Sequence, residues 1–270
     1  MPPKKQDKSE TTYGKTKVKG KEKEKKPTNE VVNFYEILPK SLCPKYHNPN
    51  FDHHQIKLPF RILVVGGSGS MKTNLICDMI HRMNDTFGNI KIITKAQEPL
   101  YDFLKMKIPP SHLQVTEGIS TTPDLSEFEE DEMKNLQHLT IFDDLVLEDR
   151  KIQDRLICPY FIRGRKVAKG VNCVYITQSY YMTPPTIRKN LTHIFMKKLS
   201  NNRDLNSILA EYNLGCDRDE LMKMYKEATA DNESFLMVDL GAKAKERFRK
   251  NYLEIVRLEP DSDSDSESEK

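Results

Sequence analysis

The stretch from Phe60 to Thr73, which reads FRILVVGGSGSMKT, constrains the fold of this chain more than any other segment. Its first part, residues 61–65, is an apolar and β-branched run of the kind found in fully buried strands. Glycines and serines fill 66–70, and Lys72 begins a segment in which apolar residues recur at helical spacing. A strand, a glycine-rich loop, Lys-Thr and a helix in this order predict a phosphate-binding P-loop.

The chemistry of phosphate binding accounts for the residue types in this loop. Small residues let backbone N–H groups curl around a phosphate, and the helix N-terminus adds partial positive charge. Lys72 is expected to reach the β- and γ-phosphates of ATP, and Thr73 to bind Mg²⁺ through its hydroxyl group. Met71 departs from the pattern, which has glycine directly before the lysine. The nucleotide-binding candidates are Gly66, Gly67, Ser68, Gly69, Ser70, Met71, Lys72 and Thr73.

The charge of the chain is unevenly distributed. It has 43 Lys and Arg against 40 Asp and Glu, but residues 1–26 carry ten lysines and four acids, and residues 259–270 carry six acids and one lysine. A near-neutral body between such ends argues against a uniformly basic coat protein. No apolar run approaches the roughly 18 residues that a membrane span needs. The five cysteines form no C-x-x-C pair, which disfavours a disulfide framework or zinc finger and favours a reducing compartment.

Strand-like and helix-like segments alternate through the body, which predicts an α/β fold with a mostly parallel, three-layer sheet. The predicted strands are 60–65, 90–94, 113–116, 139–142, 171–177, 193–199 and 235–240. The predicted helices are 72–84, 98–106, 148–167 with a kink or break at Pro159, 186–190, 203–212 and 218–230. We also predict a loop at 118–132, a basic run at 243–250 that could be helical, and an edge strand or docked segment at 252–258.

Five parts are predicted along the chain: a disordered basic tail at 1–29, a lead-in segment at 30–57, a P-loop ATPase domain at 58–242, a basic extension at 243–258 and a disordered acidic tail at 259–270. The tails have too few apolar side chains to offset the entropy of ordering. The basic tail is interpreted as a tether to nucleic acid, a nuclear-import signal or a solubilising segment. In the lead-in, His53 and His54 have no partner at ligand spacing, so a surface loop is preferred over a metal site.

Two aspartates supply what a P-loop lacks for hydrolysis, a carboxylate for Mg²⁺ and a group that activates water. Asp143 and Asp144 follow the buried run at 139–142, at the carboxyl end, where ligands of open α/β sheets bind. We expect this strand tip and that of 61–65 to be neighbours that share one cleft. Asp143 is assigned to Mg²⁺, directly or through water, and Asp144 to the attacking water as its base. The alternative is an aspartate pair that caps the next helix.

Gln178 ends the next predicted strand, where its amide can bind the γ-phosphate or the attacking water. The alternative is a polar strand end without a catalytic role. Arg163, Arg165 and Arg188 lie near predicted element ends, and a guanidinium from the same or a neighbouring subunit would stabilise transition-state charge. The sequence leaves open which of them acts, and a surface or DNA-contact role fits each one equally well.

Four segments together resemble the viral genome-packaging ATPases of the FtsK/HerA superfamily, which occur in poxviruses and other large DNA viruses, virophages and polinton-like elements. The segments are GGSGSMKT, IFDD, FIRGRKVAKGVNCVYITQSYY and TIRKN. The similarity covers roughly residues 58–240. It implies a RecA-like core, a homo-oligomeric ring, ATP and Mg²⁺ as ligands, and ATP-driven movement of double-stranded DNA into a preformed capsid.

The resemblance also assigns residues. It implies Lys72 and Thr73 at the nucleotide and Mg²⁺, Asp143-Asp144 as the Walker B pair, and Gln178 as the sensor. Two departures stand out: a methionine at position 71 where glycine is usual, and an aspartate at 144 where glutamate is more widespread. The implied partners are capsid or portal-vertex proteins, and the implied location is the virion or a viral factory in the host cytoplasm or nucleus.

Several alternatives stay open. The lysines at 166, 169, 189, 197 and 198 are candidate contacts for DNA phosphates or else solvated surface charges. The chain could be a helicase or DNA-pumping ATPase of the same superfamily that acts in replication or segregation. It could also be a nucleotide-binding structural protein without turnover, an alternative that Met71 keeps open. A small-molecule kinase is disfavoured because the sequence has no recognisable lid or second-substrate segment.

Overall fold

The computed structural model of the protein describes residues 31–128, 136–212 and 214–256. Its contacts divide the chain into two units, Met1–Cys43 and Pro44–Lys270. In the first unit, the described residues 31–43 form turns and bends. The tails predicted to be disordered, 1–29 and 259–270, lie outside the described residues.

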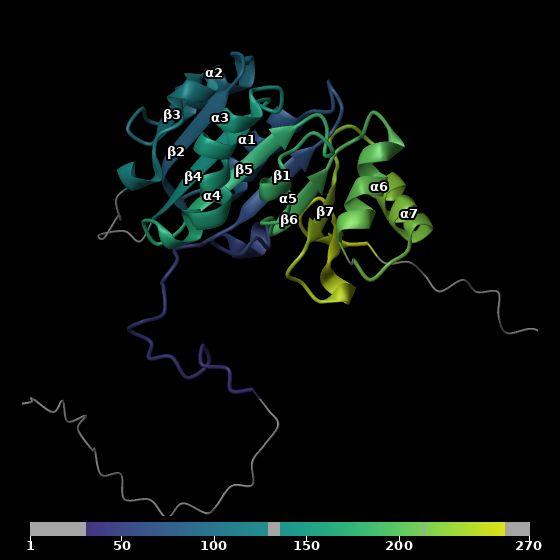
Figure 1. Ribbon diagram of the computed structural model, residues 1–270, viewed down its shortest axis with the longest axis horizontal. Coiled ribbons are helices and arrows are strands. Elements are labelled where there is room, and N and C mark those ends of the chain that lie inside the picture. The colour runs from purple at the N-terminus through teal and green to yellow at the C-terminus, as the bar shows by residue number, and fades with distance from the viewer. Residues whose placement is uncertain (1–30, 129–135, 213, 257–270) are drawn as a thin grey trace, which may run out of the picture. The chain divides into compact units, whose positions relative to one another are not determined.

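Nine strands, counted over the described residues, form one sheet in the second unit (Figure 1). In chain order they are β1 (Arg61–Val65), β2 (Phe87–Thr94), β3 (Leu113–Glu117), β4 (Gln137–Asp143), β5 (Val171–Thr177), β6 (His193–Met196), β7 (Leu236–Asp239), β8 (Phe248–Lys250) and β9 (Glu254–Ile255). Their order across the sheet is β3-β2-β4-β5-β1-β6-β7-β8-β9. Strands β1 to β6 pair in parallel, whereas β7, β8 and β9 are added antiparallel at one side. The predicted mostly parallel sheet is therefore confirmed.

Helices cover both faces of this sheet. They are α1 (Lys72–Arg82), α2 (Pro99–Lys107), α3 (Arg150–Leu156), α4 (Cys158–Arg163), α5 (Pro185–Arg188), α6 (Asn202–Glu211) and α7 (Arg218–Ala228). Short 3₁₀ helices lie at 51–53, 119–121, 125–127, 164–166 and 244–246. None of the helices within the described residues combines the length and apolarity needed to cross a bilayer.

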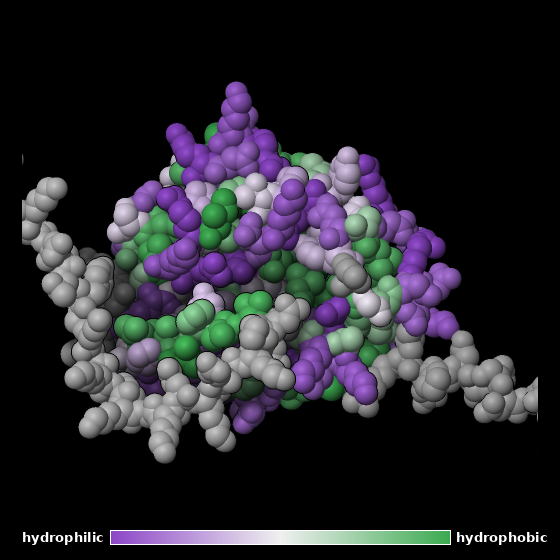
Figure 2. Space-filling view, turned by 60° about the horizontal axis from the view of Figure 1, so that its bottom comes forward, coloured by the Kyte–Doolittle hydropathy of each residue, from purple (hydrophilic) through white to green (hydrophobic). Residues whose placement is uncertain are grey.

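Alternation along the strands builds a separate apolar core on each face. In β1, Leu63 and Val65 join the core that includes residues of α3 to α7, whereas Ile62 and Val64 join the core that includes residues of α1 and α2. This alternation follows from the two-residue period of a strand. The arrangement is the three-layer α/β fold with a mostly parallel central sheet that the sequence predicted. In Figure 2, hydrophilic residues gather along the upper edge of the face that it shows.

The strand order corrects one expectation about the site. Strands β1 and β4 are not neighbours, because β5 pairs with both of them and lies between. All three strands run parallel, so their carboxyl ends meet at one edge of the sheet. The loop after β1, the acids after β4 and Gln178 after β5 are therefore placed in a row.

The predicted helix at 148–167 is divided, as Pro159 suggested. Asp149 caps α3, since its carboxylate accepts hydrogen bonds from the amides of Lys151, at 2.8 Å, and Ile152, at 3.3 Å. A second helix, α4, starts at Cys158, with Pro159 in its first turn, where a missing N–H costs no helical hydrogen bond. The 3₁₀ helix at 164–166 ends the segment.

The C-terminal segment belongs to the sheet, which corrects two predictions. The basic run at 243–250 is not a continuous helix, because β8 pairs with β7 and buries Phe248 and Arg249. The sheet thus continues beyond residue 242 to Ile255, where β9 supplies the predicted edge strand. Tyr252 docks on one face of the sheet, with its ring against those of Phe195 and Phe235.

Part of the N-terminal lead-in, predicted at 30–57, packs with the body of the protein. Residues 44–57 group with the body, where Asn50 donates a hydrogen bond to the carbonyl of Asn84 at 2.8 Å. His54 is fully buried rather than in a surface loop, and its Nδ1 accepts a hydrogen bond from the amide of Ile56 at 3.0 Å. Burial, with smaller contributions from His53 and Arg82, lowers the pKa of His54 from 6.5 to about 4.

This buried histidine makes stability depend on pH. The folded state keeps His54 neutral, whereas the unfolded chain takes up a proton near pH 6.5. The contribution of neutral His54 to the free energy of unfolding is therefore complete above pH 6.5 and is lost as the pH falls towards 4. We expect the free energy of unfolding to fall by roughly 1–2 kcal/mol more in the wild type than in His54→Asn between pH 7 and pH 5. The amide oxygen of the substitute can still accept the hydrogen bond from Ile56. Urea denaturation at both pH values measures the difference, and equal losses in the two proteins would contradict the prediction.

Candidate nucleotide-binding site

The loop between β1 and α1 is shaped by close packing against the segment after β6. A Cβ atom on Gly66 would lie 2.6 Å from Cβ of Lys197, and one on Gly67 would lie 2.5 Å from Oγ of Ser200. The amide of Gly67 donates to the carbonyl of Lys198 at 2.8 Å. Only glycine fits at these two positions, so the loop can follow the end of β6 closely.

Met71 adopts a backbone conformation that the usual glycine would adopt without strain. It has φ 62° and ψ 36°, in the left-handed region, and directly precedes α1 as its N-cap. This conformation costs an L-residue with a Cβ roughly 1–2 kcal/mol. The loop thus takes the left-handed conformation at this position despite the methionine, which also lines the cavity described below.

The strain at Met71 gives a stability prediction. We expect Met71→Gly to have a free energy of unfolding about 1 kcal/mol higher than Met71→Ala, because both variants remove the side chain but only glycine relieves the left-handed strain. Urea denaturation of the two variants at pH 7.5 measures the difference. An alanine variant as stable as the glycine variant would show that the loop changes shape to remove the strain.

Lys72 lies at the first position of α1 and reaches back across the loop. Its Nζ donates to the carbonyls of Gly66, at 3.0 Å, and Gly67, at 2.8 Å. Burial lowers the pKa of Lys72, and the nearby carboxylates of Asp143 and Asp144 oppose that shift. The first-turn amides of α1 lack intrahelical acceptors, as in every α-helix. The ammonium group and these amides form a cationic lining suited to phosphate.

Asp143 is held in place by Tyr101, a residue of α2. The hydroxyl of Tyr101, on α2, donates to Oδ2 of Asp143 at 2.6 Å, and both side chains are buried. Burial raises the pKa of Asp143 to about 6, with Glu98 and Asp144 adding to the rise and Tyr101 and Lys72 opposing it. A carboxylate in such a setting gains from a cation, because a cation replaces the lost solvation.

Asp144 and Gln178 contact one another. Asp144 takes φ 55°, a left-handed conformation that aspartate tolerates better than most residues. Its amide donates to the carbonyl of Ile176 in β5, at 3.3 Å. The amide group of Gln178 donates to Oδ1 of Asp144 at 3.2 Å. The turn after β4 thus directs the carboxylate of Asp144 toward Gln178, which follows β5.

These groups share one cavity of about 540 Å³. The predicted site residues that line it are Ser68, Gly69, Met71, Lys72, Thr73, Asp143, Asp144 and Gln178. Gly66, Gly67 and Ser70 shape the loop instead, and Oγ of Ser70 donates to the carbonyl of Gly67 at 2.7 Å. Sequence reasoning missed the end of β2 and the loop after it, which add Thr94, Ala96 and Glu98 to the lining. Its position at the carboxyl end of β2 was the signal that could have found it.

The residues present fit ATP and Mg²⁺. Glycine-rich backbone, a lysine and a helix N-terminus meet the needs of phosphates, and the oxygens of Thr73 and Asp143 meet those of Mg²⁺. Within the described residues, no three His, Cys, Asp or Glu side chains are grouped to hold a metal ion by themselves. Mg²⁺ in proteins is commonly held by one or two carboxylates together with substrate phosphates, which matches this donor set.

The three candidate arginines lie away from this cavity. Arg163 and Arg165 are exposed and precede β5, whose seven residues put them roughly 20 Å from Gln178 at the other end of the strand. Arg188 is buried, pairs with the carboxylate of Glu211 and stacks over the ring of Tyr180. None of the three is placed to reach a nucleotide in its own chain.

The candidate lysines differ in how far they are buried. Lys197 is buried, and its Nζ donates to the carbonyls of Asn232 and Glu233, so it is not available to DNA. Residues 166, 189 and 198 are exposed, and 169 is half-buried. The exposed lysines remain candidates either for contacts with DNA phosphates or for solvated surface charges.

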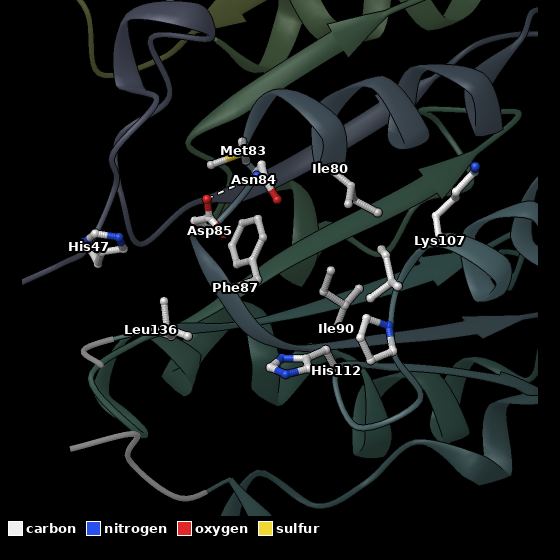
Figure 3. Close-up of a pocket in the computed structure, with 12 residues that line it drawn as sticks. His47, Ile80, Met83, Asn84, Asp85, Phe87, Ile90, Lys107, His112 and Leu136 are labelled. Carbon is white, nitrogen blue, oxygen red and sulfur yellow. Dashed lines mark hydrogen bonds between the residues drawn. The ribbon is translucent and has the colours of Figure 1, made fainter. Parts of the chain in front are cut away.

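A somewhat larger cavity, about 590 Å³, lies at the opposite end of α1 (Figure 3). Ile80 and Met83 line it from that end of α1, and Phe87 and Ile90 from the start of β2. Asp85 is the one carboxylate among its lining residues, all of which are described. Without a glycine-rich loop or a pair of acids, this cavity lacks the chemistry for a nucleotide with Mg²⁺.

Several known proteins are similar to this chain in sequence or in structure. The sequence profile of the family described as "Poxvirus A32 protein" matches residues 49–246. The "DNA packaging protein OPG160" of vaccinia virus (strain Copenhagen) is 22% identical over 197 residues, which cover 68% of this chain and 70% of that protein. The DNA-packaging ATPase B204 from Sulfolobus turreted icosahedral virus has a TM-score of 0.49 and 15% identity over 76% of this chain and 98% of that chain. EssC (ATPases 2 and 3) from Geobacillus thermodenitrificans has a TM-score of 0.49 and 11% identity over 73% of this chain, which spans only 40% of that one.

Proposed function

We propose that this chain, which belongs to the poxvirus A32 protein family, is an ATP-driven motor that moves double-stranded DNA into a viral capsid. The vaccinia virus relative is named a DNA packaging protein. The observation that carries the proposal is the single cavity in which Lys72, Thr73, Asp143, Asp144 and Gln178 converge. ATP hydrolysis needs a phosphate-binding loop, a carboxylate that binds Mg²⁺ and a second acid beside it.

Each residue has a distinct role in this proposal. Lys72 and the N-terminus of α1 bind and orient the phosphates, and Thr73 and Asp143 would hold Mg²⁺. ATP supplies the hydrolysable bond, and bound Mg²⁺ would neutralise charge on its phosphates. Asp144 accepts the proton of the attacking water, and Gln178, hydrogen-bonded to Asp144 at 3.2 Å, orients that carboxylate. Tyr101 keeps Asp143 in the direction needed for the metal.

The positions of the arginines support a ring. Because Arg163 and Arg165 are exposed at the far end of β5, either one would reach a γ-phosphate only from a neighbouring subunit. We therefore propose a homo-oligomeric ring in which one of them acts across the interface. We further propose that the ring works where virions assemble, against capsid or portal-vertex proteins.

The test is the rate of ATP hydrolysis with and without double-stranded DNA, measured beside the mass of the particle. A motor is expected to be stimulated several-fold by DNA and to form a ring-sized oligomer in the presence of ATP. A rate of ATP hydrolysis that is the same with and without DNA would contradict the proposed motor. ATP binding without turnover would instead support the nucleotide-binding structural protein, for which the strained Met71 is the favouring observation.

A further inference from the structure

The described part of the N-terminal unit, residues 31–43, exposes an unusual number of large apolar side chains. Six of them lie in 31–42, which we call the apolar segment, and each is more than half exposed: Val31, Val32, Phe34, Tyr35, Ile37 and Leu42. Single exposed apolar residues are ordinary on a protein surface. A contiguous group of them indicates a surface that another molecule covers.

Two aromatic residues occupy the central positions of a tight turn in this segment. The amide of Glu36 donates to the carbonyl of Asn33 at 3.1 Å, and the amide of Tyr35 donates to Oδ1 of Asn33 at 3.2 Å. The side-chain amide of Asn33 donates in turn to the carboxylate of Glu36 at 2.8 Å. Central turn positions usually carry small or polar residues, whereas here they carry Phe34, 69% exposed, and Tyr35, 87% exposed. The turn therefore presents both rings to the surroundings.

The charge next to the apolar segment is mostly positive. The basic tail at 1–29 lies just before it and carries ten lysines against four acids, and seven of the twelve residues in 15–26 are lysine. Residues 30–43 add Glu30, Glu36 and Lys40. With every acid counted, residues 1–43 carry eleven lysines against six acids, a surplus of five positive charges.

An anionic membrane surface fits both of these features. Aromatic and aliphatic side chains gain free energy by entering the boundary between headgroups and acyl chains, and lysines are attracted to acidic headgroups. Stable attachment to a bilayer generally needs two such signals together. The turn also suits insertion, because the amides of Tyr35 and Glu36 are already paired with Asn33 and cost less to remove from water.

DNA and a second copy of the chain each fit only one of the two features. A DNA duplex would neutralise the lysines, but its phosphates and sugars offer little apolar surface to side chains such as Val32 and Ile37. A second copy offers its acidic residues 259–270 to the lysines, but that sequence contains no large apolar residue to receive the rings.

We propose that the apolar segment is a peripheral membrane-binding element, in which the turn with Phe34 and Tyr35 enters the surface of an anionic bilayer and the basic tail contacts its headgroups. The inference does not rest on the proposed motor, because it involves neither the nucleotide cavity nor the movement of DNA. It adds a lipid surface to the partners proposed above.

The sequence contains no tryptophan, which allows a direct test of insertion. Tyr35→Trp places a single fluorophore in the turn, and Phe103→Trp places one at an exposed aromatic position of α2 as the matched control. Each full-length variant is mixed with vesicles of phosphatidylcholine, with or without phosphatidylserine. We expect the emission of Tyr35→Trp to shift to shorter wavelengths only with vesicles that contain phosphatidylserine, and the emission of Phe103→Trp to stay unchanged.

A second pair of variants measures what the rings contribute to affinity. Phe34→Ser with Tyr35→Ser removes both rings and keeps every lysine, whereas Phe103→Ser with Met106→Ser removes two exposed apolar side chains of α2. In co-sedimentation with phosphatidylserine vesicles, the turn variant is expected to bind roughly tenfold or more weakly, and the control to bind like the wild type. Added salt should weaken binding of the wild type, since it screens the lysines. Thermal melting verifies that each variant folds.

Three results would overturn the inference. Equal vesicle binding by the wild type and the turn variant, including no binding by either, would show that the rings do not enter a bilayer. Loss of affinity for a DNA duplex in the turn variant, with vesicle binding unchanged, would make DNA the occupant. A lower particle mass of the turn variant in the absence of lipid would make a second copy of the chain the occupant. The proposed motor would stand in each case, because it is tested by hydrolysis and its stimulation by DNA in the wild type.

Discussion

Lys72→Ala is expected to lower ATP turnover by roughly 100-fold or more, because the substitution removes the one ammonium group among the residues that line the cavity. Nζ of Lys72 lies within 3.0 Å of two loop carbonyls and faces the carboxylates of Asp143 and Asp144. A phosphate placed there meets a positive charge in a half-buried setting, where electrostatic interactions are stronger than in water. Alanine is a good helix former and leaves α1 intact.

The measurement is steady-state phosphate release, together with binding of a fluorescent ATP analogue. Lys105→Ala is the matched control, since Lys105 is an exposed lysine of α2 that pairs with Asp102 at 3.0 Å, outside the cavity. The control should hydrolyse ATP at the wild-type rate. Turnover in Lys72→Ala as fast as in the control would remove the assignment of the P-loop.

The second large effect is expected at Asp144. Asp144→Asn should slow hydrolysis roughly 100-fold or more while ATP affinity changes by no more than a few-fold, because an amide cannot accept the proton of the attacking water. Asparagine also tolerates the left-handed conformation seen at this position, with φ 55°. Its side-chain oxygen can still accept the hydrogen bond from Gln178. The fold and the geometry of the site are therefore preserved.

The companion variant Asp143→Asn separates the two carboxylates. It should weaken the dependence of ATP binding on Mg²⁺, since Asp143 is assigned to the metal and is oriented by Tyr101 at 2.6 Å. Titrations of Mg²⁺ against nucleotide binding and single-turnover hydrolysis distinguish the effects. Equal losses of Mg²⁺-dependent binding in both variants would contradict the division of roles between the acids.

The elements that build the site were largely predictable. Residues 61–65, 90–94, 139–142 and 171–177 each carry enough apolar and β-branched side chains to indicate a buried strand, and each strand forms within a few residues of the prediction. Chemistry at strand ends was predictable for a similar reason. Parallel strands bring their carboxyl ends to one edge, so the acids after 142 and the glutamine after 177 were expected there.

Partners that lie far apart in the sequence were not predictable. Tyr101 and Asp143 are 42 residues apart, and no local pattern links a tyrosine on a helix to an acid after a strand. Arg188 and Lys197 looked like free cations in the sequence, but Glu211 and two backbone carbonyls hold them. Burial of His54 depends likewise on the body packing over it.

The sequence by itself determined which segments become strands and helices, and which chemical groups stand at their ends, because these properties depend on residues within a few positions of one another. Only the tertiary structure decided that β5 separates β1 from β4, so that Gln178 stands between the phosphate loop and the acid pair. It also decided that Asp204 ties the loop after Gln178 to α6. Strand order and such long-range hydrogen bonds result from the packing of two faces of a sheet, and that packing depends on all the layers at once.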